Sequence, residues 1–467
     1  MSFAISSQFL FRLEKNGGYI YDKLNDNTIV INDIGAKILL AISENPNVVY
    51  NQIPDLMELI QNHVVTKKEA WHFISKMKRI GILIESQCSD LPNKFNVSRE
   101  NQRIPISQTS DSSAPVSAPM YLEIYPTMSC NLHCLFCFID DSVRKEFSYS
   151  RMSFPLFRKV VEEALEHKIF YISLLGGEPL LIPWLGEAIE FCEAKRMRLE
   201  IVTNATLIDE TIAKRLKGKR LVSLNVSLHG KAKTHDLLTS SNKSYERVLK
   251  GLDLLKKYNV KFSIGFTFTR INNSIDDIAN VIQIAQEHAV ENLSVRCFQA
   301  VGHGADHVTE LSVSPQEVIK SYERIVDLVK ERMKIYALGT FAFIKYHSPI
   351  PRHPLNKIRA FFCDVGIRKL DILPNGDVIP CILLWQTDRE RFILGNVEKD
   401  CLLELWEKSS ILSLLRNNKG PTECKECKYI EICRGGCPVT ARIKYRSWNR
   451  RDPNCPNIIK VDEKFGK

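Results

Sequence analysis

Residues 130–137 read Cys-Asn-Leu-His-Cys-Leu-Phe-Cys, a Cys-x3-Cys-x2-Cys motif made by Cys130, Cys134 and Cys137. The motif directly follows a strand-like run at Tyr121–Tyr125. Three thiolates at this spacing can hold one 4Fe–4S cube and leave its fourth iron without a protein ligand. Such an iron can bind a small molecule, whereas structural zinc is enclosed by four protein ligands. The motif favours iron–sulfur chemistry, and a zinc knuckle with His133 as the fourth ligand is the alternative.

Downstream of this motif, strand-like and helical runs alternate. The strand-like runs are Tyr121–Tyr125, Phe170–Leu175, Leu199–Thr203, Val222–Leu228, Phe262–Thr269 and Leu293–Phe298. The helical patterns between them include Phe157–Glu166, Leu185–Lys195, Tyr245–Lys257 and Ile278–His288. This alternation predicts a parallel sheet with right-handed crossovers, and six such units make a partial barrel in the α/β class. A capping box at Ser314-Pro315-Gln316-Glu317 predicts one further helix.

Short motifs stand at the ends of three strand-like runs, where barrel enzymes place their active sites. Gly176-Gly177-Glu178-Pro179 ends the second run, Thr203-Asn204-Ala205-Thr206-Leu207 the third, and Val226-Ser227-Leu228-His229-Gly230 the fourth. The two glycines allow the backbone to approach a ligand closely, and the Glu178 carboxylate can accept hydrogen bonds from an ammonium group.

The cysteine motif, with Phe136 before its last cysteine, resembles that of the radical S-adenosylmethionine superfamily. The resemblance implies a 4Fe–4S cluster on Cys130, Cys134 and Cys137 whose open iron binds S-adenosyl-L-methionine. One electron then cleaves the sulfonium and yields a 5′-deoxyadenosyl radical. The family also implies an electron donor of the flavodoxin or ferredoxin type. The residues that the resemblance assigns to cofactor binding are Phe136, Gly176, Gly177, Glu178 and Ser227.

The chain departs from the family pattern at three positions near this site. Ala205 replaces the usual Gly of the third motif, which predicts a less permissive turn. His229 replaces the usual Asp of the fourth motif. Many relatives place an Arg soon afterwards as a second clamp on the cofactor, and Thr239 is the nearest position here.

Seven further cysteines lie in the last quarter of the chain and resemble the SPASM extension of radical enzymes. They are Cys363, Cys381, Cys424, Cys427, Cys433, Cys437 and Cys455. The family partition assigns Cys424, Cys427, Cys433 and Cys455 to one auxiliary 4Fe–4S cluster and Cys363, Cys381 and Cys437 to another. Some relatives add an eighth cysteine just before the first, and this chain has none there. The sequence therefore predicts three clusters, one auxiliary cluster having an iron without a protein thiolate. A zinc ribbon is the alternative.

Residues 1–87 show short strand-like runs at Leu10–Leu13, Tyr19–Tyr21 and Thr28–Ile31, three helical patterns at Ile34–Ile42, Ile53–Gln61 and Lys67–Arg79, and a last strand at Ile82–Glu85. This is a winged-helix layout. It resembles the peptide-recognition domain of ribosomal-peptide maturases, which implies that a leader peptide adds as a strand beside the third strand. A DNA-binding winged helix is the alternative. Residues 1–87 hold nine Lys or Arg and nine Asp or Glu, without the basic excess typical of DNA binders.

Composition sets the remaining limits. The chain has 467 residues, 44% hydrophobic and 25% charged, with a formal net charge of +10. It has no apolar run long enough to span a membrane and no pattern typical of a secretory signal. Fourteen cysteines without an export signal indicate metal binding and a cytoplasmic protein. Cys88, Cys192, Cys297 and Cys401 lie outside the motifs and are interpreted as core or inert thiols.

We therefore expect four regions: a winged-helix domain at 1–87, a linker at 88–119, a partial (β/α)6 radical SAM barrel at 120–345, and a SPASM domain at 346–467. The order of motifs most resembles maturases that join Cys sulfur to the α-carbon of another residue of a precursor peptide, the sactipeptide class. The alternatives are a carbon–carbon crosslink or epimerisation on the same scaffold, a formylglycine-type sulfatase maturase, and a DNA-binding iron–sulfur sensor. No nucleic-acid partner is expected.

Overall fold

The computed structural model describes residues 3–15, 17–44, 67–85, 116–290, 292–329, 333–338, 358–361, 363–427 and 430–455. The helix predicted at Ile53–Gln61 and most of the predicted linker lie outside the described residues. The chain divides into two units. One comprises Met1–Ser117 with Glu166–Phe170, and the other comprises Ala118–Leu165 with Tyr171–Lys467.

The first unit is built on a three-stranded antiparallel sheet in the order β2-β3-β4. Its elements are β1 (Phe3–Ile5), β2 (Phe9–Glu14), β3 (Gly17–Asp22), β4 (Asn27–Ile31), α1 (Asp33–Glu44), α3 (Lys67–Arg79) and β5 (Leu83–Glu85). The buried face of α1 supplies Ala36, Ile38, Leu39 and Ile42 to the core of this unit. The predicted strands and the predicted helix Lys67–Arg79 are confirmed, and β1, which pairs with β5, is an addition.

The second unit contains an 11-stranded sheet in the order β13-β12-β11-β10-β9-β8-β7-β6-β14-β15-β16. Neighbours from β13 to β14 are parallel, and β15 and β16 continue the sheet in antiparallel pairing. Its strands are β6 (Tyr121–Ile124), β7 (Tyr171–Leu174), β8 (Arg198–Thr203), β9 (Val222–Ser227), β10 (Phe262–Phe268), β11 (Asn292–Cys297), β12 (Lys334–Leu338), β13 (Ile358–Phe361), β14 (Lys369–Ile372), β15 (Asp377–Ile379) and β16 (Gly395–Asn396).

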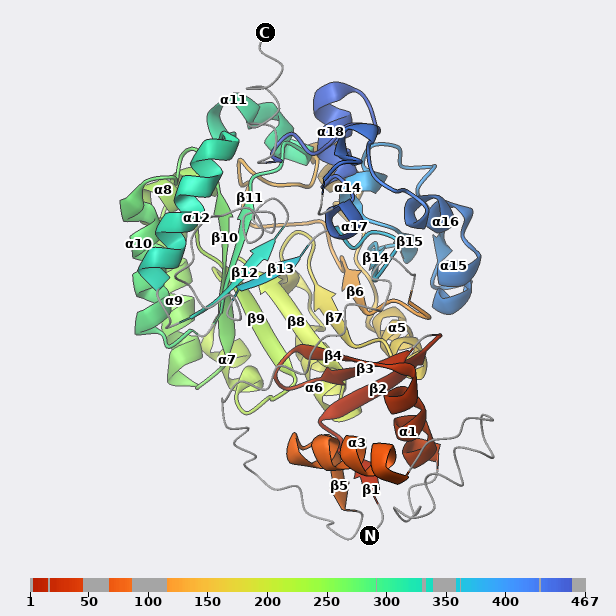
Figure 1. The fold of residues 1–467 in the computed structure, drawn as a ribbon. Coiled ribbons are helices and arrows are strands. Elements are labelled where there is room, and N and C mark those ends of the chain that lie inside the picture. The colour runs from red at the N-terminus through yellow and green to blue at the C-terminus, as the bar shows by residue number, and fades with distance from the viewer. Residues whose placement is uncertain are drawn as a thin grey trace. The chain divides into compact units, whose positions relative to one another are not determined.

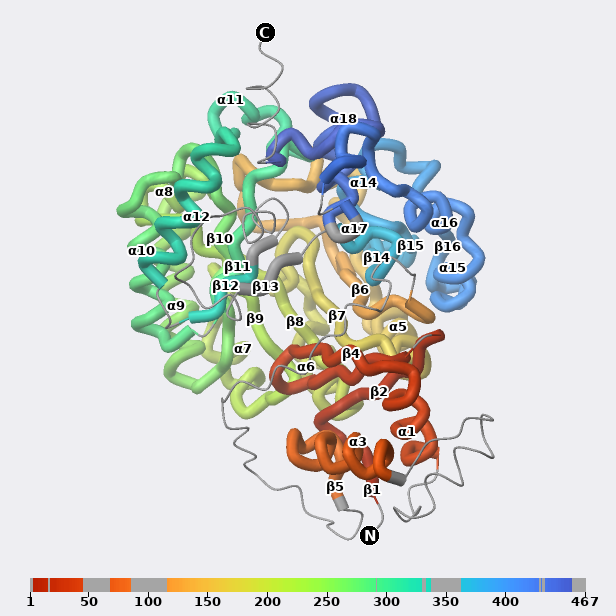
Figure 2. The backbone as a smooth tube through the Cα atoms, viewed as in Figure 1, coloured from red at the N-terminus to blue at the C-terminus, as the bar shows by residue number. Residues whose placement is uncertain are grey.

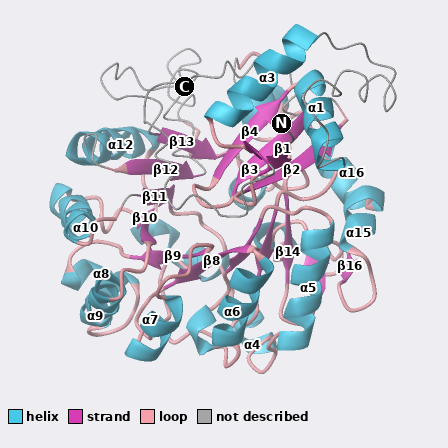
Figure 3. Cartoon of the chain, turned by 90° about the horizontal axis from the view of Figure 1, so that it is seen from below, coloured by secondary structure: helices cyan, strands magenta, loops and turns pink. Residues whose placement is uncertain are grey.

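Helices follow most of the parallel strands and lie outside the curved sheet, as Figure 1 and Figure 3 both show. They are α4 (Asp141–Glu146), α5 (Phe154–Glu166), α6 (Leu185–Lys195), α7 (Glu210–Leu216), α8 (Ala232–Leu238), α9 (Ser244–Lys257), α10 (Ile275–Glu287), α11 (Val308–Leu311) and α12 (Pro315–Val329). The predicted capping box begins α12, since the Ser314 hydroxyl accepts from the Glu317 N–H and the Glu317 carboxylate accepts from the Ser314 N–H. The fold is the predicted partial α/β barrel.

The sheet extends further than the six predicted strands. On one side β12 and β13 continue the parallel order beyond β11. On the other, β14 returns from the cysteine-rich part of the chain to pair with β6, with Lys369 opposite Tyr121 (Figure 1 and Figure 2). The remaining elements are short: α14 (Ile382–Trp385), α15 (Leu402–Lys408), α16 (Ser410–Arg416), α17 (Ile430–Cys433), α18 (Pro438–Tyr445), and the 3-10 turns η2 (Pro179–Leu181), η3 (Gly302–His307) and η5 (Thr422–Cys424).

Candidate functional site

The first cysteine motif forms the loop between β6 and α4, at the carboxyl end of β6. Burial raises the pKa of the Cys130 thiol to about 11, partly offset by the Leu132 N–H, which donates to its Sγ at 3.4 Å. Burial also raises the pKa of Cys134 well above its ordinary value, and the nearby Cys137 and Cys130 thiols raise it further. Thiols such as those of Cys130 and Cys134 ionise readily only beside positive charge, which a metal centre supplies. This donor set fits an iron–sulfur cluster.

A cation from α4 contacts one of these sulfurs. The Arg144 guanidinium donates from Nη2 to Cys137 Sγ at 2.8 Å and from Nη1 to the Leu132 carbonyl at 3.2 Å. Only 15% of the Arg144 side chain is exposed. The helix that carries it begins at Asp140, whose carboxylate accepts from the Ser142 N–H at 2.8 Å. Arg144 therefore places a largely buried cation directly against Cys137 Sγ, a contact that the sequence did not predict.

The alternative of a zinc knuckle needs His133 as a fourth ligand. In the structure the His133 Nε2 lies 3.1 Å from the Asp141 carboxylate, and its ring packs edge-on against His303 at 4.3 Å between centroids. About half of the His133 side chain is exposed. The imidazole thus has partners other than the cysteines, which weakens the zinc interpretation.

The two glycines after β7 allow that strand end to lie directly against the segment that leads into the cysteine loop. The Gly177 N–H donates to the Thr127 carbonyl at 2.9 Å, and the Glu178 N–H donates to the Ser129 carbonyl at 2.9 Å. A Cβ at Gly177 would lie 1.9 Å from the Ser129 carbonyl oxygen, and Gly176 has a φ of +118°. The glycines therefore fix the backbone immediately before Cys130. In the structure, the glycines thus allow close contact between the turn after β7 and the segment before Cys130.

Glu178 is fully buried and its carboxylate has three donors within the protein. Oε1 accepts from the Thr203 hydroxyl at 2.6 Å and from the Leu180 N–H at 3.0 Å, and Oε2 accepts from the Asn204 N–H at 2.8 Å. Burial raises the pKa of Glu178 to about 7, although these hydrogen bonds oppose the rise. Glu178 ties the turn after β7 to the turn after β8, and its contact with a ligand ammonium group stays a prediction.

The turn after β8 reaches the cysteine loop through its asparagine. The Asn204 amide donates from Nδ2 to Asn131 Oδ1 at 2.9 Å and approaches Cys130 Sγ at 3.8 Å, and the Asn131 amide donates to the Thr206 hydroxyl at 2.8 Å. Ala205 adopts a φ of +58°, the left-handed conformation that glycine tolerates best. Alanine is therefore more restricted at this position than the glycine of the family motif, as expected.

Phe136 and the motif after β9 lie together. The ring of Phe136 packs edge-on against His229 at 4.6 Å between centroids. His229 is buried, and burial with the nearby His235 lowers its pKa well below the ordinary value, so its imidazole is neutral. The Ser227 hydroxyl makes no hydrogen bond with any described residue. Thr239 cannot act as the missing arginine clamp, because its buried hydroxyl donates to the His235 carbonyl at 2.8 Å.

The seven downstream cysteines influence one another's pKa in a group of three and a group of four, and their assignment to two clusters stays a prediction. Burial raises the pKa of Cys363, Cys381 and Cys437 to about 12 each, and each of these thiols also raises the pKa of another of the three. In the second set, burial raises the pKa of Cys424 to about 11, and the Cys455 and Cys427 thiols add to the rise. Burial also raises the pKa of Cys433 well above its ordinary value, and the Cys455 and Cys424 thiols add to that rise. The structure thus brings together three thiols in one place and four in another. Cys401 begins α15.

A buried ionic network positions Cys381. The ammonium of Lys369 on β14 contacts Glu123 on β6 and lies 2.9 Å from the carboxylate of Asp371. Asp371 is fully buried, and its other oxygen accepts from the Ile382 N–H at 2.8 Å, at the start of α14 directly after Cys381. The network holds the first turn after Cys381 against the pair of strands that begins the barrel.

One amide joins the two cysteine regions. The Gln386 side chain, just after α14, donates from Nε2 to the Phe138 carbonyl at 2.9 Å and accepts at Oε1 from the Asp140 N–H at 2.8 Å. Phe138 and Asp140 directly follow the last cysteine of the first motif. The motif spacing gives no signal for Gln386, Asp371 or Arg144, because each acts on a segment that only the tertiary fold brings near.

The structure also bears on membrane association. Among the helices in the described residues, none has both the length and the apolar character needed to cross a membrane.

Two parts of the chain match known protein families. Residues 124–292 match the radical SAM superfamily, and residues 363–428 match the iron–sulfur cluster-binding domain called SPASM. The first match contains Cys130, Cys134 and Cys137 together with the motifs after β7, β8 and β9. The second begins at Cys363.

Characterised relatives share about a quarter of the aligned residues. The chain is 25% identical over 348 residues to the mycofactocin maturase MftC of Mycobacterium tuberculosis, covering 73% of this chain and 83% of that protein. It is 26% identical to an AdoMet-dependent heme synthase of Methanosarcina barkeri, covering 73% of this chain and 97% of that one. It is 22% identical to the subtilosin biosynthesis protein AlbA of Bacillus subtilis, covering 74% and 73%.

Among solved structures, SuiB of Streptococcus suis bound to S-adenosylmethionine has the same fold over almost the whole chain. The TM-score is 0.73 at 21% identity, and the alignment covers 97% of this chain and 99% of SuiB. SuiB bound to its precursor peptide SuiA aligns with a TM-score of 0.70, covering 96% and 98%.

Proposed function

Because the chain is a radical SAM protein with a SPASM iron–sulfur domain, we propose that it matures a ribosomally synthesised peptide by forming Cys thioether bonds, sulfur to α-carbon. The observation that carries the proposal is the grouping of ten cysteines: three around the loop after β6, and sets of three and four beyond it. MftC is named as a mycofactocin maturase and AlbA as a bacteriocin biosynthesis protein, and SuiB has been solved with a precursor peptide.

Cys130, Cys134 and Cys137 would hold the catalytic 4Fe–4S cluster. When bound, this cluster with S-adenosyl-L-methionine supplies a 5′-deoxyadenosyl radical that can remove hydrogen from an unactivated C–H bond. Around it, Phe136, the turn at Gly176 and Gly177, Glu178 and Ser227 would form the cofactor site. The unengaged hydroxyl of Ser227 suits a contact with the cofactor carboxylate. Glu178 would act chiefly by fixing the turns after β7 and β8.

The remaining cysteines would hold two auxiliary 4Fe–4S clusters, one on Cys424, Cys427, Cys433 and Cys455 and the other on Cys363, Cys381 and Cys437. The second set offers three thiolates, which leaves one iron for a substrate Cys thiolate. Carbon–sulfur bond formation releases one electron more than the radical consumes, and an auxiliary cluster can accept it.

Residues 1–87 would bind the leader of the precursor. β4 is an edge strand of the three-stranded sheet, so a leader could add beside it. Helix α3 of the same unit carries Lys67, Lys68, Lys76, Lys78 and Arg79 against the single acid Glu69. An acidic leader would therefore be attracted to this unit. An electron donor of the flavodoxin or ferredoxin type and a cytoplasmic location belong to the same proposal.

The test is anaerobic reconstitution followed by turnover with a candidate precursor. We expect about twelve irons per chain and reductive formation of 5′-deoxyadenosine. Changing Cys130, Cys134 and Cys137 together to Ala should abolish deoxyadenosine formation. A thioether removes two hydrogen atoms per crosslink and consumes a Cys, whereas epimerisation leaves the mass unchanged. A carbon–carbon crosslink leaves every Cys free for alkylation, and a formylglycine maturase converts a single residue without a crosslink. Deoxyadenosine formed by the triple variant would refute the assignment of the catalytic cysteines.

A further inference from the structure

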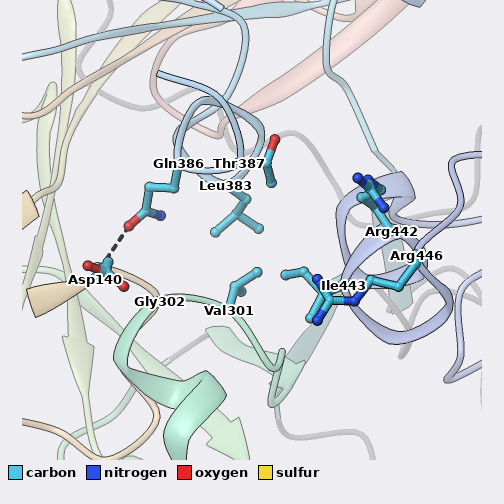
Figure 4. A pocket seen from close by; sticks show the side chains of 9 residues that line it. All are labelled: Asp140, Val301, Gly302, Leu383, Gln386, Thr387, Arg442, Ile443 and Arg446. Carbon is cyan, nitrogen blue, oxygen red and sulfur yellow. Dashed lines mark hydrogen bonds between the residues drawn. The ribbon is translucent and has the colours of Figure 1, made fainter. Parts of the chain in front are cut away.

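A surface pocket lies where the cysteine loop after β6 meets the SPASM region, all within the second unit. Its volume is about 250 Å³. Figure 4 shows Arg442 and Arg446 on one side and Asp140 with Gln386 on the other, while Leu383 contributes an apolar side chain between them. Pockets for whole cofactors usually exceed about 300 Å³, so this one is sized for one or two amino-acid residues.

Apart from Val301 and Gly302, the lining residues of the pocket lie on segments that follow a cysteine of a predicted cluster. Asp140 lies three positions after Cys137. Leu383 and Gln386 belong to the turn that starts at Cys381. Arg442 lies on α18, which starts at Cys437, and Arg446 ends that helix. A residue seated here would therefore lie between the loop of the catalytic cysteines and the three-cysteine set.

The charged groups of the pocket are two arginines on one wall and one aspartate on the other. No carboxylate of a described residue lies within ion-pair distance of either the Arg442 or the Arg446 guanidinium. Arg442 instead lies over the ring of Trp448 at 5.8 Å, and Arg446 is exposed. On the opposite wall the Asp140 carboxylate is engaged by the Ser142 N–H at 2.8 Å as the cap of α4. Two guanidiniums that form no ion pair with a described residue, beside an apolar floor and across the pocket from Asp140, are suited to a carboxylate on a short side chain.

We propose that this pocket binds a carboxylate of the substrate peptide and so selects sequences with an acidic group near the residue to be modified. The inference rests on the proposed function, because it assumes a peptide substrate. The carboxylate can belong to an Asp or Glu side chain or to the C-terminus of the peptide. Arg442 and Arg446 act as binding residues, and they place the peptide without contacting the reacting atoms.

Binding of short capped peptides to the reconstituted holoenzyme tests the proposal directly. Equilibrium dialysis would compare acetyl-Gly-Gly-Glu-Gly-Gly-amide with its Gln counterpart, and acetyl-Gly-Gly-Gln-Gly-Gly with a free C-terminus as the third probe. We expect a carboxylate probe to bind about tenfold more tightly than the neutral peptide. Preference for the Glu peptide identifies a side chain as the source, and preference for the free C-terminus identifies the terminus. The R442Q/R446Q double variant should abolish the preference.

The matched control is Lys444→Gln, which removes a cation from the same helix at a position outside the pocket. It should leave the preference intact. Equal binding of all three probes, or a preference that survives in the double variant, would overturn the proposal. Deoxyadenosine formation would be measured with dithionite and with a reduced flavodoxin. If the R442Q/R446Q variant loses activity only with flavodoxin and binds the probes as the wild type does, the arginines contact the electron donor. That result would also overturn the proposal. Failure of the wild type to cleave S-adenosyl-L-methionine at all would instead count against the proposed function.

Discussion

Replacing Arg144 by Gln should lower the reduction potential of the catalytic cluster. The guanidinium donates to Cys137 Sγ at 2.8 Å, and its side chain is largely buried. Reduction adds negative charge to the cluster, which a neighbouring cation stabilises. One charge about 6 Å from the added electron is worth about 3 kcal/mol at an effective dielectric constant of about 20. Because about 59 mV corresponds to a tenfold change for one electron, and so to about 1.4 kcal/mol, we expect a decrease of about 60–130 mV.

The assay is a redox titration followed by electron paramagnetic resonance. The catalytic cluster is recognised as the signal that changes when S-adenosyl-L-methionine is added. Arg144→Lys keeps the charge but loses one of the two donors, so its potential should fall by less than half as much. Arg389→Gln is the matched control. Arg389 contacts Glu146 and the Ser142 hydroxyl on the same helix, and neither of these partners is a cysteine.

An unchanged potential in Arg144→Gln, with normal iron content, would refute the reasoning. So would an equal decrease in the Arg389 control, because the effect would then come from general loss of positive charge near α4. Iron content and circular dichroism of each variant separate a tuned cluster from a damaged fold.

Three further predictions concern the surroundings of the clusters. Gly177→Ala would place a Cβ 1.9 Å from the Ser129 carbonyl, so reconstituted protein should lack about one cluster of three, whereas Gly218→Ala, which strains a backbone of φ +77° but meets no atom within 4 Å, should retain full iron by colorimetric assay. Lys369→Met leaves the buried Asp371 carboxylate and the partly exposed Glu123 carboxylate without their cation and should cost about 3–5 kcal/mol in chemical denaturation, and a stability loss below about 1 kcal/mol would contradict the ionic network. An acidic leader peptide should bind full-length protein with an affinity that falls as salt rises, and neutralising the α3 lysines should flatten this dependence in calorimetric titrations.

The barrel could be predicted from the sequence because its signals are local. Each of the six predicted strands appears within two residues of its expected ends, and the capping box at Ser314 starts α12 as expected. β12, β13 and β14 were not predicted. The pairing of β14 with β6 joins positions far apart in the chain and depends on closing that distance.

The candidate site divides in the same way. The ten cysteines could be proposed as ligands from the sequence, because ligand spacing is a property of short segments. Arg144, Asn204 and Gln386 were missed as neighbours of these cysteines, because their partners are set by the packing of separate elements. For Glu178, the sequence motif was recognised but did not reveal the hydrogen bonds that the side chain makes within the protein. Its motif indicated a ligand contact, whereas the described carboxylate is satisfied by Thr203 and two backbone N–H groups.

The pairing of β14 with β6 also has a consequence for the order of folding. Lys369 and Tyr121 are opposite each other in the sheet, so this edge cannot form until some 250 residues after β6 have left the ribosome. Contacts of such high sequence separation slow folding and prolong the exposure of unpaired strand edges. During that interval β6, which leads into the cysteine loop, has only β7 as a partner. If the clusters are inserted only after the complete chain is released, no metal is bound while the sheet is still incomplete. A chain truncated before β14 should aggregate.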